Sequence, residues 1–320
     1  TSTPQPVTAD TTFPICSITK TFTATLAMQL SEQGDLDLND RIVDLLPWFR
    51  VKDREATSRA RVIDLFHHHT GWSGDHCFDP VPPGGSITEK CMLQARYREQ
   101  IVPFDQAWMY SNTNLAFAGH VLSVVGGKPY ETLVEERILS PLGLDASCFN
   151  YSTSAPDDNF AWGHPPIYAD DDIGELEPIF TPFPPTAGSA GGIQSTVHDM
   201  LKYARFQLDG KDSSGNTLLS NEALAFAHAP AVDAPTGGFT GLTWFVRNYG
   251  EVSSAYHGGT YIGYRTLLQL VPDHDQWRQV SACPVVQTDE AGSRSGPRRR
   301  GQHIRRVADR HRRPEQGSPR

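Results

Sequence analysis

Four strand-like segments follow one another near the end of the chain, and they limit the folds that it can adopt. Their sequences alternate polar and apolar residues or carry β-branched and aromatic side chains, with Gly, Asp or Pro between them. The segments are GLTWFVRNY (241–249), SSAYHGGT (253–260), YRTLLQLVP (264–272) and QWRQVSACPVV (276–286). Helical patterns fill the middle of the chain. Helices grouped apart from consecutive strands favour an antiparallel sheet with helices beside it, so we expect an α+β fold.

The helices are predicted from apolar residues at helical spacing and from capping residues. In the first helix Ile18, Phe22, Leu26 and Leu30 recur at i+4 spacing, and Gly34 is a natural stop. The others are a short helix ending near Pro47, a helix in 57–72 closed by Gly71, one from 112 to 125, one beginning at Pro129, and one capped by Ser195 or Thr196 and ended by Gly210. Residues 75–90 and 150–190, rich in Gly, Pro and Asp, are expected to be irregular.

Composition excludes several classes of protein. The chain has 320 residues with 38% apolar content, and no run of apolar residues approaches the length of a membrane span. Its five cysteines show no CxxC spacing and are odd in number, which argues against a disulfide scaffold or a zinc site. No signal peptide is visible at the start, so localisation stays open between the cytoplasm and a secreted or periplasmic protein that lacks its signal.

Charge is distributed unevenly. Residues 291–320 hold ten Arg against Asp309 and Glu315, a local charge of +8, while the whole chain carries −9, so the remainder carries −17. An acidic body argues against a nucleic-acid-binding core. The tail has almost no apolar content and is expected to be disordered. We expect it to be solvated and idle, the alternative being sequence-independent attraction to nucleic acid or another anionic surface.

Ser17 and Lys20 lie three residues apart at the start of the first predicted helix. Residues at this spacing share a face of a helix, and a serine at the N-terminus sits among unpaired N–H groups and the positive end of the helix dipole. A lysine on that face that is partly removed from water can lose its proton and serve as a base. The pair therefore has the chemistry of an activated nucleophile. The alternative is a capping serine followed by a solvated lysine.

A second candidate is Tyr110-Ser111-Asn112, just before another predicted helix. A tyrosine hydroxyl near a cationic lysine is driven toward phenolate and can pass a proton to a leaving group. The amide of Asn112 offers both a donor and an acceptor to a substrate. The alternative is an ordinary turn with a half-buried tyrosine.

A third candidate is His257-Gly258-Gly259 in the second of the four predicted strands. Two glycines let the edge of a strand approach a ligand closely. The N–H of Thr260 would then complete an oxyanion hole with the N–H of Ser17. The alternative is a bulge in an ordinary strand.

The order of these motifs resembles that of the serine β-lactamase and penicillin-binding-protein superfamily. The Tyr-x-Asn form, in place of Ser-Asp-Asn, points to its class C-like branch (peptidase S12 type), which also contains DD-peptidases, esterases and D-aminopeptidases. The resemblance covers about residues 12–275. It is carried by FPICSITKTFTA, QGDLDLNDRI, VIDLFHHHTGW, the long segment YSNTNLAFAGHVLSVVGGKPYETLVEERILSPLGL and SAGGIQSTVHDMLKYARFQL.

The resemblance implies a β-lactamase/transpeptidase-like fold. Residues 1–61 and 185–290 would form a subdomain with an antiparallel sheet flanked by helices, and 62–184 a mostly helical subdomain. Ser17 would be the acylated nucleophile, Lys20 its general-base partner and Tyr110 the proton shuttle, and Asn112 would contact the acyl side chain. No metal or organic cofactor is implied, and the partner would be a small-molecule or peptide-like substrate; the oligomeric state stays open.

One motif departs from the β-lactamases, which carry Lys-Thr-Gly where this chain has His257-Gly258-Gly259. A histidine is mostly neutral at pH 7 and holds a substrate carboxylate less well than a lysine does. His-Gly-Gly occurs among esterase-like and aminopeptidase-like members. The resemblance therefore implies an ester, amide or peptide substrate rather than strong β-lactamase activity.

The run His67-His68-His69 suggests a metal site at first sight. However, consecutive helical positions point about 100° apart, and no acid or cysteine lies at a helpful spacing. His69 falls on the family's "HT-G" position. We expect no metal here.

The ends of the chain also depart from the family pattern. Only sixteen residues precede Ser17, too few for the strands that usually come first, and 276–286 is more polar than the usual closing strand. We therefore expect incomplete terminal strands, unpaired sheet edges and a less firmly held oxyanion hole. Three hypotheses stay open: an active serine hydrolase, an inactive or truncated homologue that binds ligands, and a nucleic-acid- or surface-binding protein that acts through its tail.

Overall fold

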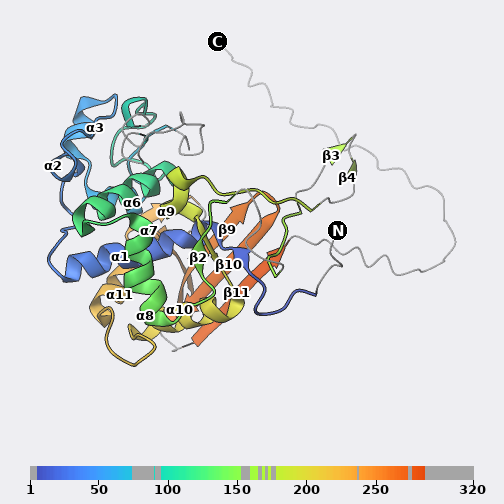
Figure 1. Ribbon diagram of the computed structural model, residues 1–320. Helices are drawn as coiled ribbons and strands as arrows, with labels where there is room; N and C mark the ends of the chain where they lie inside the picture. The colour runs from blue at the N-terminus through green and yellow to red at the C-terminus, as the bar shows by residue number, and fades with distance from the viewer. Residues whose placement is uncertain are drawn as a thin grey trace, which may run out of the picture. The chain divides into compact units, whose positions relative to one another are not determined.

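A computed structural model describes residues 6–73, 90, 95–152, 159–164, 168–169, 172–173, 178–235, 238–272 and 276–284. They belong to one compact unit, Thr1–Val286. The predicted irregular segment 75–90, apart from Lys90, lies outside the described residues, as do part of 150–190 and the whole Arg-rich tail 291–320. The fold is α+β, as predicted (Figure 1).

Six strands form the main antiparallel sheet, in the order β11-β10-β9-β8-β7-β6. Figure 1 labels β9, β10 and β11 of this sheet. Their bounds are β6 Val232–Ala234, β7 Gly238–Thr240, β8 Phe245–Tyr249, β9 Val252–Tyr261, β10 Tyr264–Val271 and β11 Gln276–Pro284. The four predicted strands are β8 to β11, each paired with the next along the chain. The polar segment predicted at 276–286 thus also forms a strand over its described residues, 276–284. Within the sheet, His257 of β9 lies opposite Leu268 of β10, and Thr260 opposite Arg265.

A second, small sheet receives the chain just before Ser17. Its order is β1-β5-β2, with β1 Phe13–Pro14, β5 Ile193–Ser195 and β2 Cys148–Phe149. The N–H of Ile15 donates to the carbonyl of Ile193 at 3.0 Å, which extends the pairing toward the first helix. A further pair, β3 Tyr168–Ala169 and β4 Asp172–Ile173, is antiparallel.

The predicted first helix is confirmed as a 3₁₀ turn, η1 (Cys16–Ile18), followed by α1 (Thr19–Glu32). Every residue of α1 from Thr19 to Leu30 is buried, so the helix is surrounded by protein along most of its length. Its buried threonines are satisfied by hydrogen bonds: for example, Thr23 Oγ1 donates to the carbonyl of Ser189 at 2.7 Å.

The single helix predicted in 57–72 is wrong, because two short helices occupy this region, α3 (Arg54–Arg59) and α4 (Val62–Phe66). Arg61 between them is extended, and its N–H donates to Asp64 Oδ2 at 2.8 Å, which caps a new helix. The second helix ends at Phe66 rather than at Gly71. Two residues later His68 adopts a left-handed φ of 56°, which a helix cannot continue through.

The remaining helices are α2 Ile42–Leu45, α6 Asn112–Gly126, α7 Tyr130–Val134, η3 Glu135–Leu139 (a π turn), α8 Ser140–Leu142, η4 Pro185–Ala187, α9 Gly188–Gly191, α10 Val197–Asp209 and α11 Asn221–His228. The helices predicted for 112–125, after Pro129 and before Gly210 are confirmed, whereas α11 was not predicted. Gly127 and Gly210 have φ of 68° and 69°, the left-handed ends expected of glycine stops. No helix within the described ranges is long and apolar enough to cross a membrane.

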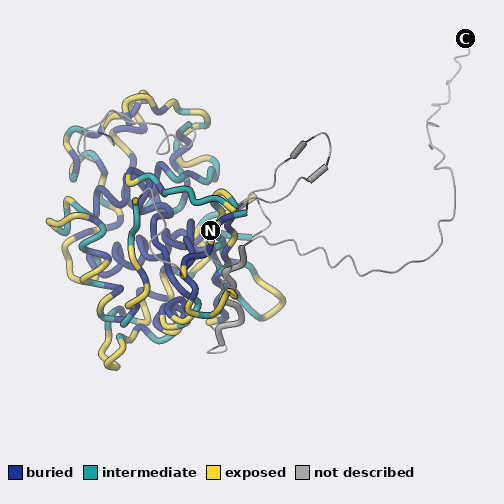
Figure 2. Tube along the Cα trace, turned by 45° about the vertical axis from the view of Figure 1, so that its right-hand side comes forward, coloured by how far each residue is buried: buried dark blue, intermediate teal, exposed yellow. Residues whose placement is uncertain are grey.

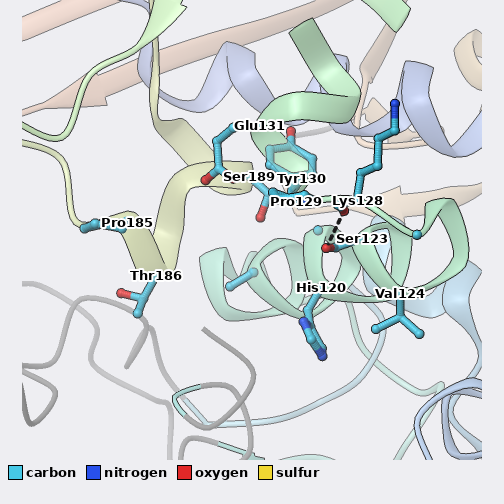
Figure 3. A pocket seen from close by; sticks show the side chains of 13 residues that line it. His120, Ser123, Val124, Lys128, Pro129, Tyr130, Glu131, Pro185, Thr186 and Ser189 are labelled. Atoms are coloured by element: carbon cyan, nitrogen blue, oxygen red, sulfur yellow. Dashed lines mark hydrogen bonds between the residues drawn. The ribbon is translucent and has the colours of Figure 1, made fainter. Parts of the chain in front are cut away.

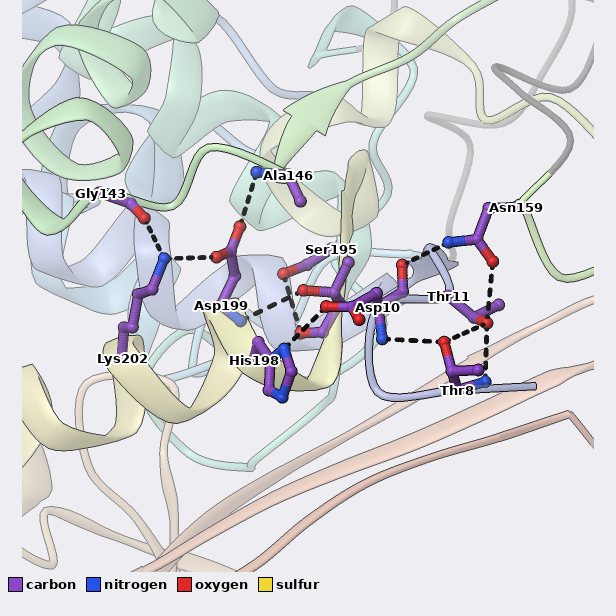
Figure 4. Close-up of polar contacts among 11 residues, drawn as sticks. Thr8, Asp10, Thr11, Gly143, Ala146, Asn159, Ser195, His198, Asp199 and Lys202 are labelled. Atoms are coloured by element: carbon purple, nitrogen blue, oxygen red, sulfur yellow. Dashed lines mark hydrogen bonds and ion pairs between the residues drawn. The ribbon is translucent and has the colours of Figure 1, made fainter.

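The first turn of α10 is tied to the segment between α8 and β2 (Figure 4). Asp199, 3% exposed, accepts from the N–H of Ala146 and from Ser147 Oγ, both at 2.9 Å, and pairs with Lys202 at 3.0 Å. Asp10 and His198 form an exposed hydrogen-bonded pair, with Nδ1 of the histidine 2.7 Å from Oδ1 of the aspartate. The buried carboxylate therefore fixes the start of α10.

One hydrophobic core joins the helices to the sheet. It includes Leu26 of α1, Leu115 of α6, Tyr203 of α10 and Leu268 of β10, all 0% exposed. Figure 2 shows buried residues in dark blue, and they gather in the interior of the fold. The core thus contains residues of both predicted subdomains, the one formed by 1–61 and 185–290 and the one formed by 62–184. The division into these two subdomains stays a prediction.

Candidate active site

Ser17 and Lys20 meet at the beginning of α1. Lys20 Nζ lies 3.1 Å from Ser17 Oγ, and the lysine is 0% exposed while the serine is partly exposed. The alternative of a solvated lysine is therefore wrong. The serine faces solvent at a helix start, and the lysine supports it from inside the protein.

Two other elements hold the ammonium group of Lys20. Its Nζ donates to Asn112 Oδ1 at 2.6 Å and to the carbonyl of Ala190 at 2.7 Å, in addition to Ser17. An ammonium group has three N–H donors, and Ser17, Asn112 and Ala190 each offer it an acceptor. Asn112 begins α6 and Ala190 lies in α9, so the site is assembled from distant parts of the chain. The amide oxygen of Asn112 thus contacts Lys20, and its expected contact with the acyl side chain of a substrate stays a prediction.

Tyr110 lies over the lysine. The centroid of its ring is 4.9 Å from Lys20 Nζ, within the range of a cation–π contact. Ser111, the next residue, caps α6 by accepting the N–H of Asn114 at 3.2 Å. The start of this helix therefore brings Tyr110 and Asn112 to the same lysine.

His257 forms the wall of the site on β9. It is 1% exposed, and its ring centroid lies 6.3 Å from that of Tyr110 and 5.2 Å from that of Phe245. Nδ1 contacts the carbonyl of Gly258 at 2.7 Å and so carries the proton. Burial, and secondly the charge of Lys20, lower the pKa of His257 to about 3. The ring is neutral at pH 7 and supplies no positive charge.

The two glycines that follow differ in their surroundings. A Cβ on Gly259 would lie 2.2 Å from Thr266 Oγ1 and 2.3 Å from the carbonyl oxygen of Ile15, whereas a Cβ on Gly258 would meet only Thr266 O, at 3.6 Å. Gly259 thus lets β9 run against the residues before Ser17. The pairing of β9 with β10 is unbroken from Ala255 to Tyr261, so the alternative of a bulge is wrong.

Cys16, directly before Ser17, has a left-handed φ of 51°, which is uncommon for a residue other than glycine. Its side chain is 1% exposed, and Sγ donates to the carbonyl of Pro14 at 3.4 Å. Burial raises the pKa of this thiol to about 12, so it stays protonated. The cysteine therefore packs beside the serine rather than competing with it as a nucleophile.

His68 was considered from the sequence only as a metal ligand, and its place beside Tyr110 was not predicted. His68 is 0% exposed, its Nδ1 accepts the N–H of Ser111 at 3.2 Å, and its ring lies 4.7 Å from that of Tyr110. His69 turns away to Asp105, at 2.8 Å. No group of three or more potential metal ligands is found in the part of the chain that the structure describes. Consecutive histidines point in different directions, and the sequence does not tell which of them is buried.

A cavity of about 430 Å³ lies beside α6, outside the site (Figure 3). One face of α6 lines it together with Tyr130, Glu131, Thr186 and Ser189. None of the predicted site residues belongs to this lining. Ser189 connects the two places, because the next residue, Ala190, provides a carbonyl to Lys20.

Comparison with known proteins adds independent information. The chain is 28% identical over 278 residues to penicillin-binding protein 4 of Amycolatopsis lactamdurans, covering 83% of this chain and 70% of that protein. It spans only 36% to 54% of the next four curated relatives. Among solved structures, a D-stereospecific amidohydrolase from Streptomyces superposes with a TM-score of 0.70 at 26% identity, over 83% of this chain and 80% of that one.

A class C beta-lactamase from Rhodobacter sphaeroides shares the fold, with a TM-score of 0.64 at 23% identity, over 85% of this chain and 80% of that one. The model of the beta-lactamase family matches residues 1–300. Since this match spans most of the chain and agrees with the fold and with these relatives, the protein belongs to the beta-lactamase family.

Proposed function

We propose that this protein is a serine hydrolase that forms an acyl-enzyme on Ser17. The observation that carries the proposal is the buried Lys20, whose Nζ lies 3.1 Å from Ser17 Oγ at a helix start. A nucleophile paired with a buried base is the arrangement that activates a serine. Similarity to a penicillin-binding protein and to a D-stereospecific amidohydrolase supports the same class of chemistry.

In the first half of the proposed reaction, Ser17 Oγ attacks the carbonyl carbon of an ester or amide, and the N–H groups of Ser17 and Thr260 bind the resulting oxyanion. Lys20 Nζ donates to Ser17, Asn112 and Ala190, so Lys20 accepts the serine proton only after it releases one of its own to solvent. We assign Tyr110 as the proton shuttle. Its hydroxyl protonates the leaving group as the C–O or C–N bond breaks, and Lys20 then passes the serine proton to the tyrosine oxygen.

In the second half, water attacks the carbonyl carbon of the acyl-enzyme. Lys20 and Tyr110 take a proton from that water, and a proton returns to Ser17 Oγ as the acid product leaves. The same pair thus manages the protons in both halves, and the enzyme ends in its starting state.

The walls of the site favour an uncharged substrate. Aromatic rings of Trp108, Tyr110, Phe245 and His257 lie 5.2 to 6.4 Å from one another in successive contacts. A substrate carboxylate near position 257 would meet the neutral ring of His257. A positively charged side chain at this position would attract the carboxylate, and the neutral ring does not. We therefore propose an ester, amide or peptide-like substrate with an apolar acyl group, and only weak β-lactamase activity.

Covalent labelling tests the proposal. The folded protein is incubated with a fluorophosphonate and, separately, with a penicillin, and intact mass is measured with Ser17→Ala as the control. We expect one fluorophosphonate adduct that is absent from the variant, and slower labelling by penicillin. No adduct on folded protein would overturn the proposal and leave a ligand-binding role. Fast penicillin turnover would overturn the proposed substrate class only.

A further inference from the structure

We propose that His68 is a positioning residue that holds Tyr110 in place for proton transfer, an inference that rests on the proposed function. His68 is 0% exposed and has a left-handed φ of 56°. A residue other than glycine adopts this conformation at an energetic cost, and persists in it where its surroundings require it. The contacts that require it all lead to the segment around Tyr110.

His68 binds the backbone on both sides of Tyr110. Its carbonyl oxygen accepts the N–H of Met109 at 2.8 Å, and its Nδ1 accepts the N–H of Ser111 at 3.2 Å. In this left-handed conformation the carbonyl oxygen and the side chain of His68 both reach the segment around Tyr110. The two peptide groups Trp108–Met109 and Tyr110–Ser111, on either side of the one between Met109 and Tyr110, are thereby held by one residue.

The ring of His68 also packs on the ring of Tyr110. Their centroids are 4.7 Å apart with an interplanar angle of 35°, and the ring of Phe245 lies 6.4 Å from Tyr110 at 15°. Contacts of this kind restrict the side-chain rotation of a tyrosine. His68 and Phe245 therefore limit the directions in which the Tyr110 hydroxyl can point.

His68 does not transfer the proton itself. Because Nδ1 accepts a hydrogen bond, the neutral ring carries its proton on Nε2. Burial, followed by the charges of Lys20 and His257, lowers the pKa of His68 well below its usual value, so the ring stays neutral. Nε2 has no hydrogen-bond partner among the described residues, so within them no hydrogen-bonded chain leads from it to Ser17.

This role predicts a dependence on the leaving group. Alkoxide leaving groups need a proton as they depart, and the proposed donor is Tyr110. Nitrophenolate leaves without one. A misplaced Tyr110 therefore slows an ethyl ester more than a nitrophenyl ester of the same acid, whereas partial unfolding slows both by the same factor.

The test compares kcat/KM for ethyl butyrate and p-nitrophenyl butyrate. Both values are calculated from the concentration of reactive Ser17, which is measured by titration with a fluorophosphonate. His68→Phe keeps the ring but loses the acceptor, and we expect a loss of about tenfold to a hundredfold with the ethyl ester and less than about threefold with the nitrophenyl ester. His68→Asn tolerates the left-handed backbone and retains an acceptor oxygen, so it recovers the ethyl ester rate to within about fivefold. His67→Phe, on the half-buried neighbour, is the matched control and changes neither rate.

Equal losses with both esters, or no loss in folded His68→Phe, would overturn the inference. If His68→Phe does not fold, His68→Gly provides the same comparison, since glycine suits a φ of 56°. A wild-type protein that a fluorophosphonate does not label would overturn the proposed function as well, and the two failures are therefore distinguishable.

Discussion

Alanine at position 259 would place a methyl group where β9 crosses the residues before Ser17. The new carbon would lie 2.2 Å from Thr266 Oγ1 and 2.3 Å from Ile15 O. Neither oxygen is free to move. Thr266 Oγ1 donates to the carbonyl of Ile15 at 2.9 Å, and the N–H of Ile15 is held by Ile193 at 3.0 Å. We therefore expect the strand and the start of α1 to separate.

The cost follows from two contributions. Overpacking a tight contact costs about 1–3 kcal/mol, and loss of the buried hydrogen bond between Thr266 and Ile15 adds about 1 kcal/mol. Gly259→Ala should therefore lower the free energy of unfolding by about 2–4 kcal/mol. The matched control is Gly258→Ala, whose methyl group meets only an atom at 3.6 Å, and we expect a change of about 1 kcal/mol or less.

Urea unfolding of both variants measures the difference. Equal stabilities would refute the close approach of β9 to the segment before Ser17. Fluorophosphonate labelling adds a functional result, because separation of the two segments moves the N–H of Thr260 away from that of Ser17. Labelling of Gly259→Ala should slow by more than its unfolded fraction explains.

Three further predictions concern the titratable side chains of His257, Asp199 and Lys20. Unfolded His257 binds a proton below its ordinary pKa of 6.5, whereas the folded ring stays neutral down to a pH of about 3. The unfolded state therefore binds more protons between these two values. As the pH is lowered through this range, the free energy of unfolding decreases by about 1.4 kcal/mol per pH unit. His257→Gln should flatten the urea-derived stability profile by that slope; an unchanged slope would contradict the neutral ring. Asp199→Ala should lower the free energy of unfolding by about 2–4 kcal/mol, because buried donors lose their acceptor. The control is Asp10→Ala, which removes an exposed contact and should lower it by about 0.5 kcal/mol or less in the same urea assay. Lys20→Ala should slow fluorophosphonate labelling of Ser17 at least about a hundredfold. The control is Lys52→Ala, which changes a surface lysine and should be labelled at the wild-type rate. Equal labelling rates of the two variants would contradict a base at position 20.

Local sequence patterns predicted the elements whose determinants are local. The alternation in 241–286 and the i+4 spacing after Ser17 identified strands and a helix correctly, because side-chain periodicity sets which face is buried. The break at Arg61 was missed. It depends on the carboxylate of Asp64 capping a backbone N–H, which competes with continuation of the preceding helix.

The candidate site was predictable only in part. The spacing of Ser17 and Lys20 places them on one face of a helix, and the structure brings them together. The role of His68 was not predictable, because it depends on a left-handed backbone and on a hydrogen bond to a residue 43 positions away. The direction of Asn112 likewise follows from where α1 packs, and that is decided by tertiary contacts.

The Ser-x-x-Lys spacing has chemical meaning only within the complete fold. In an isolated helix the lysine would be solvated, and its pKa would then stay near the ordinary value. Burial of an ammonium group is costly unless every N–H finds an acceptor, and two of the three acceptors come from α6 and α9, which lie 92 and 170 residues away. Displacement of either element would let water reach Lys20 and weaken the pair. The proposed activation of Ser17 therefore depends on the same long-range packing that stabilises the core.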